Sequence, residues 1–400
     1  MATEVETNID NSGDLPEGWN RTRFDELAKQ VADRVDPAET KAKVYIGLEH
    51  LDSNTLKIRR YGKPSDVIGQ KLAFQIGDVI FGKRRAYQRK LGVAEVNGIC
   101  SAHAMVLRAI EDAINPEFFP YFLQSDLFMD RAVAISVGSL SPTINWKTLR
   151  RQEFPLPPKP LQREIAEQAS AIDQTQELFI QCLENARGLL RSLRRQIFAD
   201  HAKKYGGIKL KSVGHWISGG TPSRSRDEFW NGDFPWVSPK DMKCEVVTNS
   251  IERITEVAVN DGVPLVPKDG ILLVIRGMIL AHKFPVALAG RELTFNQDMK
   301  AVVARDAYCP YYIFHWLLRN SQRILTLVAD SSHGTKRVPT DVLFAMKIPK
   351  PPIDVQEKAV QAFEAQRSAI EKIEEHIQHL SDLKVSLLDS YITGAVGGGA

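Results

Sequence analysis

The side chains whose types and spacing most clearly suggest a binding function lie in a basic octet, Lys83 to Lys90. The octet has five cations, no acid and one tyrosine, and Arg59 and Arg60 extend the positive charge upstream. Cations that meet phosphates release counterions from nucleic acid, and the arginine fork can pair with a guanine edge. A solvated hairpin tip is the alternative interpretation. The density of charge favours nucleic-acid binding.

The segment Gly77 to Lys83 also matches GxxxxGK, the spacing of a nucleotide-binding phosphate loop. That motif needs Ser or Thr next, because its hydroxyl binds magnesium, and here the next residue is Arg84. Val79 to Phe81 reads as a buried strand, whereas a phosphate loop needs exposed amides. We therefore reject a nucleotide site.

Other catalytic and metal signatures are missing from the sequence. There is no GxSxG elbow, and His376 and His379 lack the glutamate spacing of a zinc protease. The cysteines form no CxxC pair, which argues against zinc and against a disulfide framework and favours a reducing cytoplasm. They are Cys100, Cys182, Cys244 and Cys309. The pattern argues against catalysis and predicts no metal site.

The chain contains an internal duplication with an offset of 194 residues. The proline cluster Phe154 to Pro158 recurs at Ile348 to Pro352, and Gln162 maps to Gln356. Proline disfavours helix before it and is tolerated in a helix's first turn, so each cluster predicts an extended segment that leads into a helix. A unit this long is not a solenoid repeat. The duplication predicts two globular modules and two helices.

Apolar residues spaced alternately three and four apart follow each proline cluster, which predicts helices of about 55 Å with a heptad seam. Gln176 and Gln366 interrupt the two seams in complementary places, which favours pairing of the helices with each other. Packing of each helix on its own module is the alternative. The predicted seam residues are Ile172, Phe179, Leu183, Leu193, Ile370, Ile373, Ile377 and Leu380.

Ahead of the first proline cluster, short β-rich runs such as Val44–Leu48 are bounded by turn residues, and Pro116 predicts a helix from Asn115. Hydrophobic content of 43% and charged content of 25% are typical of a soluble globular protein. No apolar run reaches the length of a membrane span, and residues 1–14 are too polar for a signal peptide. The composition therefore predicts mixed α/β modules and no membrane association.

Taken in order, several segments resemble the DNA-specificity subunits of type I restriction–modification systems. The resemblance covers nearly the whole chain, from about Leu15 to Gly394. The hydroxyl-rich loop at Gly138 answers to the segment 331–337, although Ser139 to Pro142 departs from the pattern of the second loop. The segments that carry the resemblance are Leu15–Trp19, Trp236–Met242, Ser332–Lys336 and Ile348–Pro352 with Gln356.

This resemblance implies an α+β fold with two pseudo-symmetric mixed α/β target-recognition domains, separated by two long antiparallel, coiled-coil-like helices. Each domain would read one half of a split double-stranded DNA site. The chain itself would have no catalytic centre and bind no cofactor. Two modification (methyltransferase) subunits would carry adenosylmethionine, and restriction/translocase subunits would use ATP and magnesium. The complex would be cytoplasmic.

The corresponding predicted boundaries are a flexible leader at 1–14, the first recognition domain at 15–157, a helix at 158–205, the second recognition domain at 206–351, a helix at 352–394 and a flexible tail at 395–400. A scaffold protein without a DNA role and a self-sufficient enzyme are the rival functions. Candidate DNA contacts in the first domain are Arg59, Arg60, Lys83, Arg84, Arg85, Tyr87, Arg89, Lys90, Ser139 and Ser141. Those in the second are Arg276, Lys283, Ser331, Ser332, His333, Thr335, Lys336 and Arg337.

Overall fold

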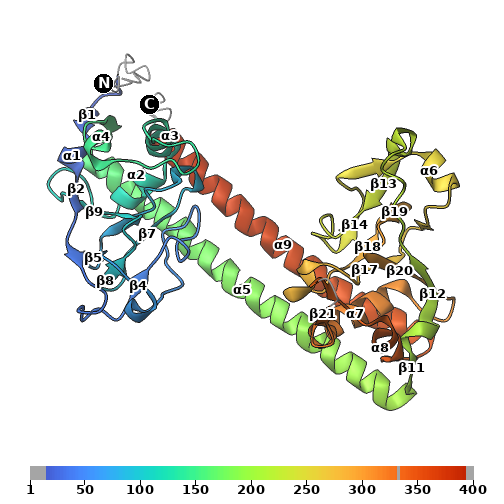
Figure 1. Ribbon diagram of the computed structural model, residues 1–400. Helices are drawn as coiled ribbons and strands as arrows, with labels where there is room; N and C mark the ends of the chain where they lie inside the picture. Colours follow the sequence, from blue (N-terminus) through green and yellow to red (C-terminus); the bar gives the residue numbers. More distant parts are fainter. Residues whose placement is uncertain (1–14, 331–333, 393–400) are drawn as a thin grey trace. The chain divides into compact units, whose positions relative to one another are not determined.

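The computed structural model describes residues 15–330 and 334–392, so the predicted leader and most of the predicted tail lie outside the described residues. The chain divides into two compact units (Figure 1). Unit 1 comprises Met1–Gln181 and Glu374–Ala400, and unit 2 comprises Cys182–Ile373. Two long helices, α5 (Lys159–Tyr205) and α9 (Ile353–Ile392), each contribute to both units.

The main sheet of unit 1 is antiparallel, with the strand order β2–β9–β6–β7. Val79, Ile80 and Phe81 of β6 are all buried, which confirms the predicted buried strand. Its strands are β2 (Ala28–Val31), β6 (Val79–Phe81), β7 (Leu91–Val93) and β9 (Met105–Ala109). The short helices of this unit are α1 (Phe24–Leu27), α2 (Phe119–Gln124), α3 (Asp126–Ala134) and α4 (Trp146–Leu149).

An aromatic core joins these helices to the sheet and to the start of α5. Phe122 packs edge-on against Phe154 with ring centroids 5.3 Å apart, and Phe128 contacts both. Ile165 of α5 and Ile392 of α9 are fully buried in the same core. The ends of both long helices are therefore part of the core of unit 1.

A second sheet in unit 1, ordered β3–β5–β8–β4, has its own core around Ile80 and Phe74. A strand pair, β1–β10, precedes α5, as the proline cluster predicts. These strands are β1 (Asn20–Arg23), β3 (Arg34–Val35), β4 (Tyr45–Ile46), β5 (Lys71–Phe74), β8 (Gly98–Cys100) and β10 (Glu153–Leu156).

The helix predicted from Asn115 begins later, at Phe119. The Asn115 side chain accepts hydrogen bonds from the N–H groups of Glu117 and Phe118 at 2.8 and 3.1 Å. An asparagine that bonds to the backbone two and three residues ahead stabilises a turn. The prediction of a helix start at Asn115 was therefore wrong by one turn.

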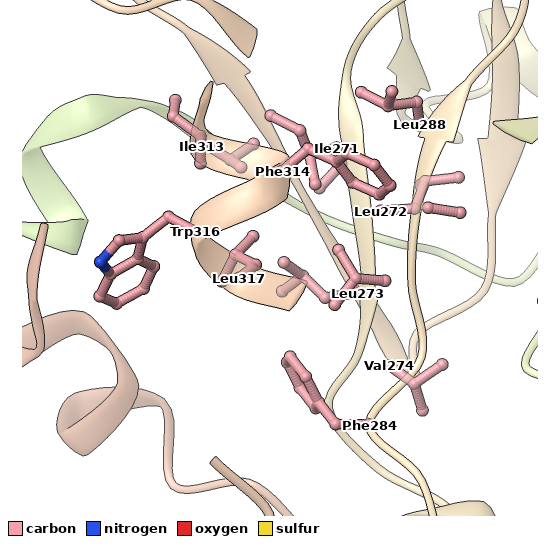
Figure 2. Close-up of a cluster of buried hydrophobic side chains, with 14 of the residues drawn as sticks. Ile271, Leu272, Leu273, Val274, Phe284, Leu288, Ile313, Phe314, Trp316 and Leu317 are labelled. Atoms are coloured by element: carbon pink, nitrogen blue, oxygen red, sulfur yellow. The ribbon is translucent and has the colours of Figure 1, made fainter. Parts of the chain in front are cut away.

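Unit 2 repeats this plan with different side chains. Its main sheet has the order β12–β20–β17–β18–β14, and helix α7 (Pro310–Leu325) packs on it. Figure 2 shows Phe314 and Leu317 of α7 directed toward β17, with Trp316 directed away from that strand. The strands of the main sheet are β12 (Gly214–Ser218), β14 (Val246–Val247), β17 (Ile271–Val274), β18 (Val286–Ala289) and β20 (Met299–Ala304).

The second sheet of unit 2 has the order β15–β13–β19–β16, and the pair β11–β23 precedes α9 as β1–β10 precedes α5. These strands are β11 (Gly207–Lys209), β13 (Trp230–Val237), β15 (Glu252–Ile254), β16 (Leu265–Val266), β19 (Leu293–Phe295) and β23 (Lys347–Pro349). The remaining elements are α6 (Glu256–Asn260), α8 (Thr340–Ala345), β21 (Ala329–Asp330) and β22 (Lys336–Arg337).

Helices α5 and α9 pair antiparallel within each unit. In unit 1, Asp173 forms an ion pair with Lys384 at 2.7 Å, whereas Phe179, further along α5, contacts His376, which is earlier along α9. In unit 2, Phe198 contacts Phe363 with ring centroids 5.7 Å apart. The α+β architecture with two mixed modules and long antiparallel helices is confirmed.

The two polar interruptions of the predicted seams have equivalent roles. The amide of Gln176 donates to the carbonyl of Ile377, and the amide of Gln366 donates to the carbonyl of Ala186, both at 3.3 Å. Each glutamine thus bonds across to the backbone of the other helix. All eight predicted seam residues are half-buried, as expected for a pair of helices with one side open to solvent.

A buried polar network lies between the helices in unit 2. Arg194 donates to Nδ1 of His315 at 3.1 Å, and arginine has only donors, so the proton of neutral His315 is on Nε2. That nitrogen lies 2.7 Å from Glu364, whose carboxylate also accepts from Arg367. Burial lowers the pKa of His315 to about 4, so the imidazole is neutral near pH 7.

Candidate nucleic-acid interface

In unit 1 the basic octet connects β6 to β7, and its first half is bonded to the hydroxyl-rich loop. The N–H of Arg85 donates to the carbonyl of Pro142 at 2.7 Å, and the N–H of Ile144 donates to the carbonyl of Lys83 at 2.9 Å. Arg84 and Thr143 form the antiparallel bridge between these bonds. We call Lys83–Gln88 together with Val137–Ile144 site 1.

Unit 2 contains the same arrangement. The N–H of Gly277 donates to the carbonyl of Lys336, and the N–H of Val338 donates to the carbonyl of Ile275, both at 2.9 Å. Arg276 and Arg337 form the bridge that Arg84 and Thr143 form in unit 1. We call Ile275–Lys283 together with Lys336–Val338 site 2.

The structure therefore brings together, in each unit, the basic segment and the loop that the sequence analysis selected separately. The loop of site 1 is closed by two hydrogen bonds between Val137 and Thr143, and the loop of site 2 by the pairing of β21 with β22. Ser331, Ser332 and His333 lie outside the described residues, so their predicted contacts stay predictions.

The octet of site 1 turns through two arginines in the left-handed conformation, Arg85 with φ +58° and Arg89 with φ +51°. Site 2 has Gly277 at the position that corresponds to Arg85, with φ +136°. In the left-handed helical region, a residue with a Cβ costs about 1–2 kcal/mol, a cost that glycine avoids. Arg85 in unit 1 therefore adopts a backbone conformation that is less favourable for arginine than for glycine.

The exposed cations of site 1 are Arg84 and Arg85, and Tyr87 beside them is also exposed. The Arg85 guanidinium donates to Ser141 Oγ at 3.2 Å, which joins one predicted contact to another. Lys83 is half-buried, and burial lowers its pKa. Arg84 and Arg85 are accordingly the side chains best placed to meet a polyanion.

Arg89 has an internal role instead. Its guanidinium donates to Asn54 Oδ1 at 3.1 Å, to Asp126 at 2.5 Å and to the carbonyl of Gln124 at 2.5 Å. Lys90 similarly donates to the carbonyl of Leu48 at 2.8 Å. These two cations fix the end of the octet against the rest of unit 1.

Arg59 and Arg60 also have carboxylate partners within unit 1. Arg59 donates to Glu177 of α5 at 2.5 Å, and Arg60 donates to Asp52. These pairs neutralise much of the positive charge that the sequence places upstream of the octet. The positive charge available at this end of unit 1 is smaller than the sequence suggests.

In site 2, Arg276, Lys283 and Arg337 are exposed, while Lys336 is half-buried, as is Thr335 just before it. A further cation, Lys300 of β20, donates to Ser218 Oγ at 2.7 Å. Burial lowers the pKa of Lys300, and the positive charge of Arg337 acts in the same direction. Sequence analysis missed Lys300, because an isolated lysine in a strand gives no signal; only the fold places its charge close to Arg337.

No helix within residues 15–330 and 334–392 is long and apolar enough to cross a membrane. Across the same residues, no cluster of three or more His, Cys, Asp or Glu side chains is arranged to hold a metal ion. His376 lies against Phe179 with ring centroids 5.4 Å apart, as part of the helix pair.

Comparison with known families identifies the type of chain. The model of the type I restriction modification DNA specificity domain matches twice, at residues 16–184 and 203–380. The chain belongs to this family. The two matches correspond to the two copies of the internal duplication, and each includes one of the two sites.

Relatives in the specificity-domain family include the specificity subunit of the Escherichia coli type I restriction enzyme EcoR124I/EcoR124II, 34% identical over 184 residues. That match covers 46% of each chain. The specificity subunit of the enzyme MjaIX from Methanocaldococcus jannaschii is 30% identical over 38% of this chain and 35% of its own. The chain thus matches less than half the length of each relative. The prediction of a specificity chain rather than an enzyme agrees with these names.

Solved structures of the family share the fold. A chain from a study of complex assembly and conformational transition in the type I R-M system aligns with a TM-score of 0.64 at 19% identity, covering 96% of this chain and 100% of that one. The type I S subunit from M. genitalium aligns with a TM-score of 0.53 at 15% identity, covering 98% of both chains. At these low identities, the alignments show a shared fold and nothing further.

Proposed function

We propose that this chain is a DNA-specificity subunit that reads a split double-stranded site, one half with site 1 and the other half with site 2. The observation that carries the proposal is the pair of matching sites, in each of which a basic turn is bonded to a loop through the same backbone hydrogen bonds. Side chains held on an ordered backbone can contact phosphates and base edges in a fixed register.

The differences between the sites support different targets for the two halves. Site 1 presents Arg84, Arg85 and Tyr87, whereas site 2 presents Arg276, Lys283 and Arg337. Base edges are distinguished by the donors, acceptors and apolar groups that face them, so unlike side chains on a shared scaffold read unlike sequences. The proposed DNA site is therefore asymmetric.

The proposal assigns catalysis to other chains. Two modification subunits would bind adenosylmethionine and methylate adenine, and restriction subunits would use ATP and magnesium, all in the cytoplasm. The long helices, of 47 and 40 residues, are the proposed spacers between the two reading domains. Helix length then sets how many unread base pairs lie between the half-sites.

Methylation mapping tests this function directly. The chain is co-expressed with its modification subunits in a host without other adenine methylation, and the methylated positions are read by sequencing. We expect one bipartite, asymmetric motif. A matched strain carries the double substitution Arg84→Ala and Arg85→Ala, and we expect it to methylate that motif much less. A chain that yields no methylated motif and no shift of random duplex DNA would contradict the proposal and favour a scaffold.

A further inference from the structure

The loop of site 1 has an apolar tip. The side chains of Leu140 and Val137 are 92% and 79% exposed. One exposed leucine on a protein surface needs no explanation. Two exposed apolar side chains on one seven-residue loop, beside the cations Arg84 and Arg85, are a feature of the site itself.

This loop holds its tip in a defined position. Val137 and Thr143 exchange backbone hydrogen bonds of 3.1 and 3.0 Å, and Thr143 Oγ1 donates to the carbonyl of Ser141 at 3.1 Å. Arg85 donates to Ser141 Oγ, the residue that follows Leu140. Leu140 is thus presented on an ordered loop, directly next to a residue that a site 1 arginine contacts.

The charges around the tip indicate what it meets. An apolar side chain flanked by arginines is poorly suited to an apolar protein partner, because the arginines would lose water without gaining an anion. Duplex DNA offers both features, phosphates for the cations and, in the major groove, the C5-methyl group of thymine. Insertion between base pairs from the minor groove is the competing mode of contact.

We propose that Leu140 contacts the C5-methyl of a thymine in the half-site that unit 1 reads, and so determines part of its sequence preference. The proposal rests on the DNA-reading function argued above. Unit 2 carries a comparable apolar side chain, Met278, which is 63% exposed and directly follows Gly277 of site 2. Both sites therefore combine exposed cations with an exposed apolar group.

Uracil substitution tests the contact, because uracil differs from thymine only by the missing methyl. The full chain, assembled with its modification subunits, is titrated against duplexes that carry the mapped site with each thymine of the half-site replaced in turn. We expect one replacement to weaken wild-type binding about four-fold, the effect of one buried methyl. Leu140→Ala should bind the thymine duplex at least four-fold more weakly and should bind both duplexes equally well.

Ile68→Ala is the matched control, since Ile68 is 93% exposed in the same unit but outside site 1. It should behave as the wild type on every duplex. Wild-type binding that no replacement weakens overturns the proposal, and so does a Leu140→Ala chain that still discriminates thymine from uracil. A third outcome also overturns the proposal. If Leu140→Ala binds all duplexes more weakly by the same factor, and the wild type binds thymine and uracil duplexes equally well, the leucine inserts between base pairs instead. Failure of the DNA-reading function is a distinct result, in which the wild type does not prefer the mapped site at all.

Discussion

Gln162 and Gln356, 194 positions apart, make equivalent hydrogen bonds at the starts of the two long helices. Gln162 Oε1 accepts from the N–H of Asn115 at 2.8 Å, and its amide donates to the carbonyl of Pro157 at 2.8 Å. Gln356 Oε1 accepts from the N–H of Cys309 at 3.0 Å, and its amide donates to the carbonyl of Pro351 at 2.9 Å. The duplication therefore extends to the partner of each glutamine, since Asn115 and Cys309 are also 194 positions apart.

Replacement of these glutamines should destabilise the units. Both side chains are buried, so Gln162→Ala or Gln356→Ala leaves backbone donors and acceptors without partners. We expect a loss of about 2–4 kcal/mol in the free energy of unfolding. Urea unfolding followed by tryptophan fluorescence measures it. Gln378→Ala, at an exposed position of α9, is the control and should change stability by less than about 0.5 kcal/mol. Equal effects at all three positions would contradict the assigned roles.

Removal of the exposed arginines of site 1 should change the salt dependence of DNA binding. For Arg84→Ala with Arg85→Ala, we expect the slope of log K against log salt to become shallower by about 0.9 for each phosphate that the variant no longer neutralises. Fluorescence anisotropy at several salt concentrations provides the slope. Arg89→Met is the matched control, because Arg89 bonds internally to Asp126 and Gln124. Arg89→Met should reduce the stability of unit 1 and leave the salt slope unchanged. If the slope of the double variant Arg84→Ala with Arg85→Ala is also unchanged, site 1 does not contact DNA.

Relief of strain at Arg85 should separate stability from binding. Arg85→Gly removes the cost of a left-handed residue and should raise the free energy of unfolding by about 1 kcal/mol. It also removes a cation, so DNA affinity should fall. Thermal unfolding and anisotropy of the same sample check both effects. Arg84→Gly removes the same charge at a residue outside that region and should lower stability. A decrease in stability for Arg85→Gly would refute the strain argument.

The stability of unit 2 should depend on His315 in mild acid. Its folded-state pKa is about 4 and its ordinary value is 6.5, so between these pH values the unfolded chain binds a proton that the folded chain does not. Stability from this group is present above pH 6.5 and falls as the pH decreases toward 4. From pH 7 to pH 5 the loss is about 2 kcal/mol.

His315→Gln keeps an acceptor for Arg194 and a donor for Glu364 but does not titrate. The difference in unfolding free energy between pH 7 and pH 5 should therefore be about 2 kcal/mol smaller in the variant than in the wild type. Denaturant unfolding at both pH values provides the comparison. Identical acid sensitivity in the two chains would show that other groups, such as the carboxylates, control it.

The proposed spacer role predicts the effect of shortening both helices together. Removing Gln176–Cys182 from α5 and Ile370–His376 from α9 deletes one heptad from each copy of the duplication and preserves the seam. Seven residues correspond to about 10 Å of helix, or about three base pairs of DNA. Methylation mapping should show a gap shorter by that amount. An unchanged gap would refute the spacer role.

Sequence patterns predicted the parts of this protein that depend on local chemistry and on periodicity. The proline clusters identified the strands before α5 and α9, and Gly206, with φ +64°, marks the predicted end of α5 at Tyr205. The matching of the loop at Gly138 with residues 331–337 came from the order of segments alone. The structure then placed the loop at Gly138 beside one basic turn and residues Lys336–Val338 beside the other.

Features that depend on distant partners could not be predicted. The charge of Arg89 is balanced by Asp126, 37 residues away, and that of Arg59 by Glu177, 118 residues away. The sequence shows charges but not their neighbours, so it overstated the number of cations free to meet DNA. The later start of α2 depends on the Asn115 side chain, which competes locally with helix formation.

The assembly of unit 1 from two separate stretches of chain determines the order in which the protein can fold during synthesis. Leu388 and Ile392 are buried in the core of unit 1, yet all of unit 2 is translated before them. At roughly 5–20 residues per second, the ribosome takes about 10–40 seconds to pass from Cys182 to Ile373. During that interval the apolar surface that will receive the end of α9 stays uncovered, so the newly made part of unit 1 exposes an aggregation-prone surface until α9 is synthesised.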